Sequence, residues 1–131
     1  MNTPLAPTFS RLDLPFTSQA PATAREQLRL FAGHLPDVTV DDAVVMVSEL
    51  VTNALVHGRP EITLRLWLTA DRLTVAVADL GESMLACAVP RLQQASGRGL
   101  IIVDALATRW GVSWPSRRVG KQVWFELQPA T

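Results

Sequence analysis

The sequence predicts an α/β two-layer sandwich, in which a mixed, mainly antiparallel sheet carries helices on one face. Three observations support this fold class. The chain has 131 residues, which is enough for one domain with a single core. Two segments in the first half repeat apolar residues at helical spacing, and later segments alternate apolar and polar residues as strands do. The resulting order is a strand, two helices, a hairpin, a loop, a helix and a closing hairpin.

The N-terminal part divides into a loose segment and a first strand. Residues 1–8 are rich in proline and are expected to be flexible, and residues 129–131 are expected to form a tail. Residues 9–128 then make up the domain. Its first segment, 9–15, alternates like an edge strand and ends at Pro15.

Two helices are expected next. Residues 24–35 place apolar side chains at helical spacing and end before Pro36, with Ser18 or Thr23 as candidate caps. The second helix covers 38–58. It has acidic residues near its start, where they suit the helix dipole, and a glycine at its end.

The second half of the chain is expected to hold two hairpins, separated by a loop and a third helix. The loop, 82–96, has small, mixed residues and room for one short helix over 88–94. The third helix begins near two glycines and is expected to stop at Gly111. The strand segments are 61–68, 71–81, 112–115 and 121–128.

Composition restricts the functional classes. Basic and acidic residues number 12 each, so no net positive field attracts nucleic acid or an anionic membrane surface. The single Cys87 excludes an intramolecular disulfide and a cysteine-based zinc cluster. No apolar run approaches the roughly 20 residues that cross a bilayer, and the N-terminus lacks the features of a secretory signal. We therefore expect a cytoplasmic protein without a direct nucleic acid or membrane partner.

Glu49, Asn53 and His57 form a polar stripe on the otherwise apolar second helix. Each follows the last by four residues, so the three share one side of the helix. Burying a carboxylate without a partner costs several kcal/mol of folding free energy, so the polar groups of this stripe need partners. Capping of a neighbouring backbone group or a helix interface would supply them, as would a ligand. For His57, a contact at the helix C-terminus is the favoured interpretation.

Two further features also have both a structural and a functional interpretation. Asp79 continues the inward parity of its strand, and Gly81 lets another group approach closely. An Asp before a Gly is, however, commonly part of a turn. Gly97 and Gly99 precede the third helix, where exposed N–H groups suit phosphate, although glycine there often serves geometry alone.

Together, these motifs resemble the nucleotide-binding domain of the GHKL superfamily, the ATPase fold shared by gyrase and histidine kinases. The stretch "ELVTNALVHG" is similar to its N box and "DLG" to its first glycine box. "GRGLIIVDALATRWGV" and "GKQVWFEL" are similar to the second glycine box and closing strands of the short bacterial anti-sigma-factor serine kinase branch. The resemblance covers about residues 9–128 and implies a Bergerat-type ATP-binding fold.

The resemblance implies a role for each polar residue, with ATP and Mg²⁺ as cofactors. Asn53 would be the Mg²⁺ ligand and Glu49 the catalytic general base. Asp79 would accept the adenine amino proton, and Gly81 would permit close contact with the ring. Residues 82–96 would form the ATP lid. The phosphates would meet the start of the third helix, where the arginine either adds a charge or is solvated: Gly97, Arg98, Gly99 and Leu100.

The closing strand departs from the superfamily pattern, which usually begins Gly-Thr. Here Gly120 is followed by Lys121 and Gln122, and the loss of the hydroxyl predicts weaker adenine binding. Strand parity places Lys121 on the inward side. From there it either reaches the nucleotide or, as is more common, extends its ammonium to solvent.

The resemblance implies a regulatory serine/threonine kinase that phosphorylates an antagonist protein of the anti-anti-sigma type. A sigma factor would be a second partner, and a homodimer fits the same family. The alternative is a non-catalytic, nucleotide-dependent protein-interaction module that uses the outer sheet face. That face carries Thr63, Arg65, Trp67, Thr74, Trp124 and Glu126. A sensor histidine kinase fragment is disfavoured, because the chain has no room for a dimerising helical hairpin and His34 lacks a following glutamate.

Overall fold

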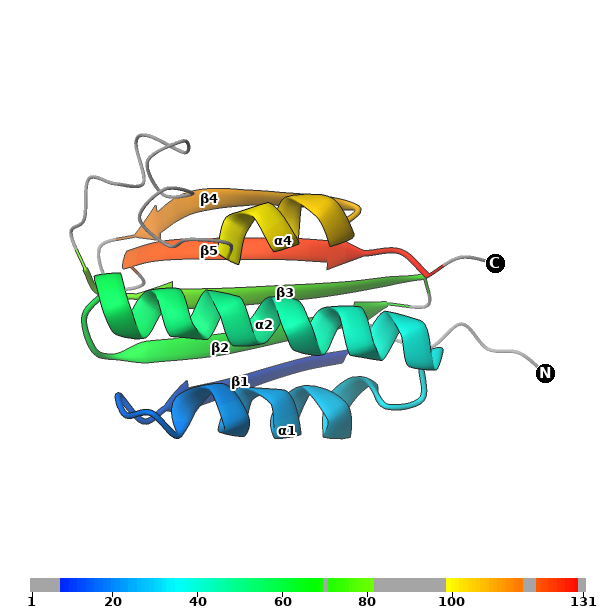
Figure 1. Cartoon of the computed structure of the whole chain (residues 1–131), viewed down its shortest axis with the longest axis horizontal. Coiled ribbons are helices and arrows are strands. Elements are labelled where there is room, and N and C mark those ends of the chain that lie inside the picture. Colours follow the sequence, from blue (N-terminus) through cyan, green and yellow to red (C-terminus); the bar gives the residue numbers. More distant parts are fainter. Residues whose placement is uncertain (1–7, 70, 82–98, 117–119, 130–131) are drawn as a thin grey trace.

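The computed structural model describes residues 8–69, 71–81, 99–116 and 120–129. Their strands form one five-stranded sheet in the order β1-β2-β3-β5-β4, and every neighbouring pair is antiparallel. Three helices lie on one face of the sheet, so the predicted α/β two-layer sandwich is confirmed (Figure 1). The strands are β1 (Thr8–Leu14), β2 (Ile62–Thr69), β3 (Arg72–Asp79), β4 (Arg109–Ser116) and β5 (Gly120–Leu127). The helices are α1 (Ala20–Ala32), α2 (Asp37–His57) and α4 (Gly99–Leu106).

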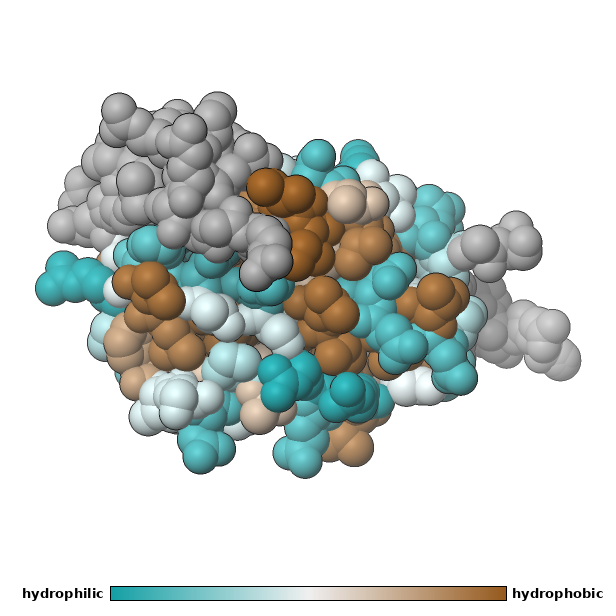
Figure 2. Space-filling view, viewed as in Figure 1, coloured by the Kyte–Doolittle hydropathy of each residue, from teal (hydrophilic) through white to brown (hydrophobic). Residues whose placement is uncertain are grey.

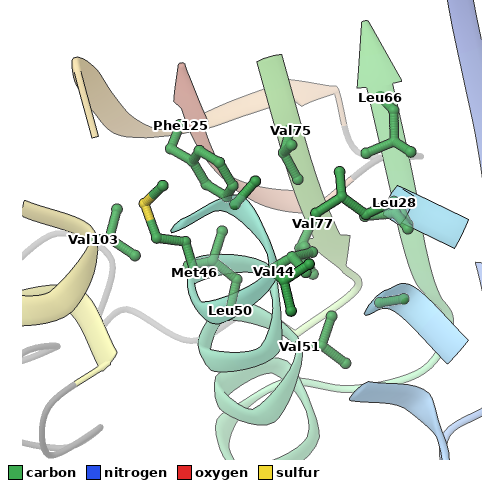
Figure 3. Packing of buried hydrophobic residues seen from close by; sticks show 14 of the residues in the cluster. Leu28, Val44, Met46, Leu50, Val51, Leu66, Val75, Val77, Val103 and Phe125 are labelled. Carbon is green, nitrogen blue, oxygen red and sulfur yellow. The ribbon is translucent and has the colours of Figure 1, made fainter. Parts of the chain in front are cut away.

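The helix-facing side of the sheet forms the core because alternate residues of each strand point toward it. Leu64 and Leu66 of β2, Val75 of β3 and Phe125 of β5 are all fully buried. Met46 of α2 belongs to the same cluster (Figure 3). Burial of such a side chain contributes about 1.5–3 kcal/mol, so this cluster is the main contact between the two layers.

Helix α1 differs from the expected helix at both ends. Its N-cap residue is Gln19, which makes no side-chain cap hydrogen bond, so both candidate caps were wrong. The Thr23 hydroxyl lies inside the helix and donates to the carbonyl of Gln19. The helix ends at Ala32, before a glycine, and the predicted last turn to Leu35 is absent.

Helix α2 agrees closely with its prediction. It starts at Asp37, directly after Pro36, and ends at His57. Gly58 closes it, because its backbone N–H donates to the carbonyl of Ala54. This long helix lies in the middle of the helical layer (Figure 1).

Helix α4 is shorter than predicted, because the chain after it joins the sheet. The helix ends at Leu106, and residues 109–116 pair with β5 as an edge strand. Trp110 stands opposite Phe125 in this pairing, and its indole N–H donates to Asp104 at 2.8 Å. The expected short helix over 88–94 and the turn between the closing strands lie outside the described residues.

The opposite face of the sheet carries none of the described helices. The strand register aligns its side chains in rows, one of which runs through Phe9, Trp67, Thr74, Glu126 and Arg109. The ring centroids of Phe9 and Trp67 lie 5.3 Å apart, so Phe9 of β1 covers part of the Trp67 indole. An open groove of about 430 Å³ follows this face, lined by Trp67, Thr74, Arg109, Ser113, Gln122, Trp124 and Glu126.

The outer surface of the helical layer is mixed. Apolar side chains appear there as separate groups between polar ones (Figure 2). The exposed large apolar residues of the helices are Leu30, Val38, Val45, Val56, Ile101 and Leu106. Among the described helices, none combines the length and the apolar character that crossing a bilayer requires.

Candidate functional site

Three elements meet at one end of the sheet. Helix α2 ends there at His57, β3 ends at Asp79, and β5 starts at Gly120 (Figure 1). Asp79 is the common point. Gly58, directly after α2, packs against its carboxylate, and Gly120 packs against its carbonyl oxygen. This end of the sheet therefore brings an acid, a helix terminus and a strand start into direct contact.

Asp79 is a buried carboxylate whose two oxygens face different partners. Its side chain is 2 % exposed. Oδ1 accepts a hydrogen bond from the backbone N–H of Gly81 at 2.7 Å and a longer one from Arg59 at 3.4 Å. Oδ2 lies 3.6 Å from Nζ of Lys121. These contacts offset the cost of burying the charge and fix the direction in which Oδ2 points.

Glycine is required around Asp79 for two reasons. A Cβ at Gly58 would overlap the carboxylate, and one at Gly81 would lie 2.7 Å from Oδ1. Gly120 has φ +75°, which L side chains rarely adopt, and a Cβ there would collide with the Asp79 carbonyl. The backbone thus forms a close cradle around this acid, which any side chain at these positions would fill.

The orientation of α2 decides where its polar stripe points. One flank faces α1, because the Ser48 hydroxyl accepts a hydrogen bond from the Arg25 guanidinium at 3.0 Å. Another flank faces α4. Met46 on that flank points toward Val103 of α4, and both belong to the buried cluster (Figure 3).

Glu49 and Asn53 lie on the flank of α2 that faces α4. They follow Met46 by three and seven residues, which places all three on one side of the helix. Both polar side chains are half-buried. His57 is half-buried in the last turn of α2. The stripe therefore leads along α2 toward the Asp79 end of the sheet.

The second glycine motif is described only at its end. Gly99 and Leu100 are the first two residues of α4. The Leu100 side chain is buried in the core, so its backbone N–H is the group that remains for an anion. Gly97 and Arg98 lie outside the described residues, as does the predicted lid, 82–96.

Few side chains in the described part of the chain are placed to bind a metal ion. Within the described ranges, no group of three or more His, Cys, Asp or Glu side chains is arranged to hold an ion. Mg²⁺ is usually bound by one or two protein oxygens together with substrate phosphates and water. The side-chain oxygen of Asn53 fits that kind of site, in which the metal arrives with the nucleotide.

Lys121 is the residue whose environment the sequence interpretation missed. Its inward parity is confirmed, but its ammonium does not extend to solvent: the residue is 5 % exposed and pairs with Asp79. The sequence shows the parity of each strand but not how the two strands pair. Asp79 ends an inward-facing series on β3, and Lys121 begins one on β5, so antiparallel pairing sets them opposite each other.

Comparison with known proteins gives an independent result. A family model described as a histidine kinase-like ATPase domain matches residues 14–127, which spans the fold from the end of β1 to the end of β5. No curated protein matches the chain. The matched range includes Glu49, Asn53, Asp79 and Lys121. The chain therefore belongs to the histidine kinase-like ATPase domain family, and this membership implies that it binds ATP.

Proposed function

We propose that this chain is an ATP- and Mg²⁺-dependent serine/threonine kinase that phosphorylates an antagonist protein of the anti-anti-sigma type. The observation that carries the proposal is the arrangement of the acids. Glu49 shares a half-buried helix flank with Asn53, and this flank leads to the buried Asp79. The site would thus combine a carboxylate that accepts a proton, Glu49, an amide that binds the metal, Asn53, and a carboxylate that binds adenine, Asp79.

The nucleotide would be held by groups of opposite character at the two ends of the site. Asp79 would accept a hydrogen bond from the adenine amino group, and Gly81 would allow the ring to approach. Asn53 would hold Mg²⁺ through its amide oxygen. The phosphates would meet the start of α4 at Gly99 and Leu100, because the first backbone N–H groups of a helix and its dipole favour anions. Gly97 and Arg98, which precede them in the sequence motif, are proposed to bind the phosphates as well.

Bound MgATP supplies the phosphoryl group, and the chain supplies the groups that orient and deprotonate the acceptor. Glu49 has its carboxylate four residues before Asn53, one helical turn away on the same flank. It would accept the hydroxyl proton of the incoming serine or threonine. General base assistance of this kind contributes about 10²- to 10⁴-fold to a rate.

Transfer from labelled ATP to a candidate antagonist tests the kinase proposal. Glu49→Gln keeps the size of the side chain and removes its basicity. We expect it to retain MgATP affinity and to lose at least about a hundredfold in transfer rate. Equal transfer by wild type and Glu49→Gln would reject this residue as the base.

The alternative function is a nucleotide-dependent protein-interaction module without turnover. The groove on the outer sheet face favours it, because aromatic side chains dominate binding hot spots and Trp67 and Trp124 line this groove. A pull-down from a native extract with and without ATP separates the functions. Stable ATP-dependent capture of a partner that never becomes phosphorylated would favour the module.

A sigma factor would be the second partner in the proposed regulatory cycle, and the chain would act on it by sequestration. The proposal also includes self-association as a homodimer. Sedimentation of the purified chain, with and without MgATP, measures the oligomeric state directly. Addition of the candidate sigma factor to the same samples measures its capture.

A further inference from the structure

The outer face of the sheet carries more positive than negative charge. The strands direct four arginines and two acids to this face, whereas the whole chain has equal numbers of basic and acidic residues. The six charged residues are Arg11, Asp13, Arg65, Arg72, Arg109 and Glu126. A face with surplus positive charge attracts an acidic partner and repels a second copy of itself.

The two acids of this face already pair with three of the four arginines. The Glu126 carboxylate lies 3.0 Å from the guanidinium of Arg109 and 3.8 Å from that of Arg72. The other acid lies 3.2 Å from the guanidinium of Arg11. None of these ion pairs includes Arg65, so its charge is the one that is left over.

The guanidinium of Arg65 keeps unused hydrogen-bonding capacity. Its Nη1 atom is buried and has no hydrogen-bond partner among the described residues. The residue as a whole is half-buried, and rotation about its side-chain bonds presents the guanidinium to an acid that arrives at the surface. A guanidinium binds a carboxylate through two parallel N–H bonds. A carboxylate from a partner would therefore satisfy a donor that the isolated chain leaves unsatisfied.

Arg65 borders the groove on this face. It shares a row with Ala76 and Trp124, and Trp67 lies two residues further along its own strand. Because neighbouring strands lie about 4.8 Å apart, the backbones of Arg65 and Trp124 are separated by about 10 Å, with the small Ala76 between them. Both half-buried indoles line the groove and offer the apolar contact area that dominates binding hot spots. The groove thus has aromatic walls and a cation at its border.

We propose that this face docks a segment of a partner protein in which an acidic residue neighbours an apolar one. The acidic side chain pairs with Arg65, and the apolar side chain lies in the groove against Trp67 and Trp124. This inference does not depend on the proposed nucleotide site, because Arg65 and Asp79 lie on opposite faces of the sheet. It adds a defined partner chemistry to the outer face.

Nucleic acid is the competing anionic partner. Its phosphates recur along the strand, and its affinity for a protein grows with the number of phosphates that lysine and arginine neutralise. Three of the four arginines on this face already pair with acids of the chain itself. The one remaining guanidinium suits a single carboxylate better than a row of phosphates.

Selection of random peptides displayed on phage, with the full chain as the target, tests the inference. We expect enrichment of peptides that carry an aspartate or glutamate next to leucine, phenylalanine or tryptophan. A synthetic peptide of the enriched sequence is then titrated by calorimetry into wild type and Arg65→Met. This variant should bind the peptide at least about tenfold more weakly, because a charge-assisted hydrogen bond is lost.

Two controls separate direct pairing from a general effect of charge. Arg72→Met removes the same charge from the same face and leaves Glu126 paired with Arg109, so it should change the peptide affinity less than about threefold. A peptide whose acid is replaced by the corresponding amide should bind wild type at least about tenfold more weakly than the acidic peptide. Arg65→Met should bind these two peptides with equal affinity.

Several results would overturn the inference. They are a failure of enrichment, enrichment of peptides without an acid, and equal losses of affinity in Arg65→Met and Arg72→Met. Binding of a fluorescent oligothymidylate that Arg65→Met abolishes would assign the face to nucleic acid instead. A dimer in sedimentation that Arg65→Met dissociates would assign it to a second copy of the chain.

The stability of the variants and the nucleotide site are measured on the same samples. If the melting temperature shows that Arg65→Met does not fold, the comparison of the acidic and amide peptides on wild type decides, and equal affinities there would overturn the inference. MgATP affinity reports on the proposed kinase separately. A chain that binds MgATP but no acidic peptide would refute the docking face and leave the proposed function intact.

Discussion

Gly58 packs against the carboxylate of Asp79 so closely that a Cβ on the glycine would overlap the acid. This contact joins the end of α2 to the end of β3. It ties the helix that carries Glu49 and Asn53 to the buried acid at the sheet end. The relative positions of the proposed catalytic and base-binding groups therefore depend on the absence of one methyl group.

Replacement Gly58→Ala should weaken MgATP binding at least tenfold, because the added methyl must displace the Asp79 carboxylate. We also expect a loss of about 1–3 kcal/mol in the free energy of unfolding, as for other overpacked sites. Calorimetry and urea denaturation measure the two effects. Gly111→Ala is the matched control, since its Cβ would lie 2.9 Å from the Trp124 ring. It should lower stability and leave ATP affinity unchanged, whereas unchanged affinity in Gly58→Ala would contradict the prediction.

The ion pair between Asp79 and Lys121 should show strong coupling in a double-mutant cycle. Asp79→Leu leaves a buried ammonium without its partner and should cost about 3–5 kcal/mol of unfolding free energy. Adding Lys121→Met removes that unpaired charge, so the double variant should be more stable than Asp79→Leu alone. Urea denaturation of the four proteins measures the coupling. Additive effects of the two substitutions would show that the pair contributes no interaction energy.

The fold was predicted well where one periodicity dominated. The alternation of Leu64, Leu66 and Leu68 with polar neighbours predicted β2, and the apolar spacing of α2 predicted a long helix. The prediction is wrong at residues 107–111, where it extends the third helix beyond Leu106. Trp110 and Val112 alternate with Gly111 in a strand, and pairing with β5 decided the conformation. Such long-range pairing is not visible in a local pattern.

Only part of the candidate site is predictable from the sequence, for a similar reason. Motif spacing indicated Asp79 and Gly81, and the structure brings these two together through the Oδ1 hydrogen bond. The close packing of Gly58 on the acid depends on how a helix end meets a strand end, which spacing does not specify. The ion pair of Lys121 required the register of β3 against β5. Both contacts of Asp79, with Gly58 and with Lys121, depend on tertiary packing, which the spacing of residues along the sequence does not specify.

Asn53→Ala should remove most of the Mg²⁺-dependent part of ATP affinity, because an alanine offers no oxygen to the metal. The increase in melting temperature on adding excess MgATP measures the effect, since a ligand stabilises the folded state according to its affinity. Thr52→Ala is a suitable control: Thr52 is exposed on the neighbouring helix position, and its hydroxyl donates to Ser48 within α2. The control should keep the full MgATP shift. An equal shift in Asn53→Ala and wild type would count against the metal role.

Arg65 on the outer sheet face is expected to destabilise the fold. Its Nη1 atom is buried and has no hydrogen-bond partner among the described residues, and Arg11 stands directly opposite it on β1. Burial and, to a lesser degree, the Arg11 charge lower the pKa of Arg65, while Asp13 acts in the opposite direction. A pKa lowered by folding means that the folded state disfavours the charged form, which Arg65 still holds at neutral pH.

Replacement Arg65→Met should therefore stabilise the chain by about 1 kcal/mol, because it removes an unsatisfied buried donor and keeps an unbranched apolar stem. This corresponds to a rise of roughly 2–8 °C in the melting temperature. Arg11→Met is the control. Arg11 is exposed and ion-paired with Asp13 at 3.2 Å, so its loss should give a smaller change. MgATP affinity should stay the same in both variants, because Arg65 and Asp79 lie on opposite faces of the sheet. A lower melting temperature for Arg65→Met would mean that the guanidinium contributes a stabilising contact.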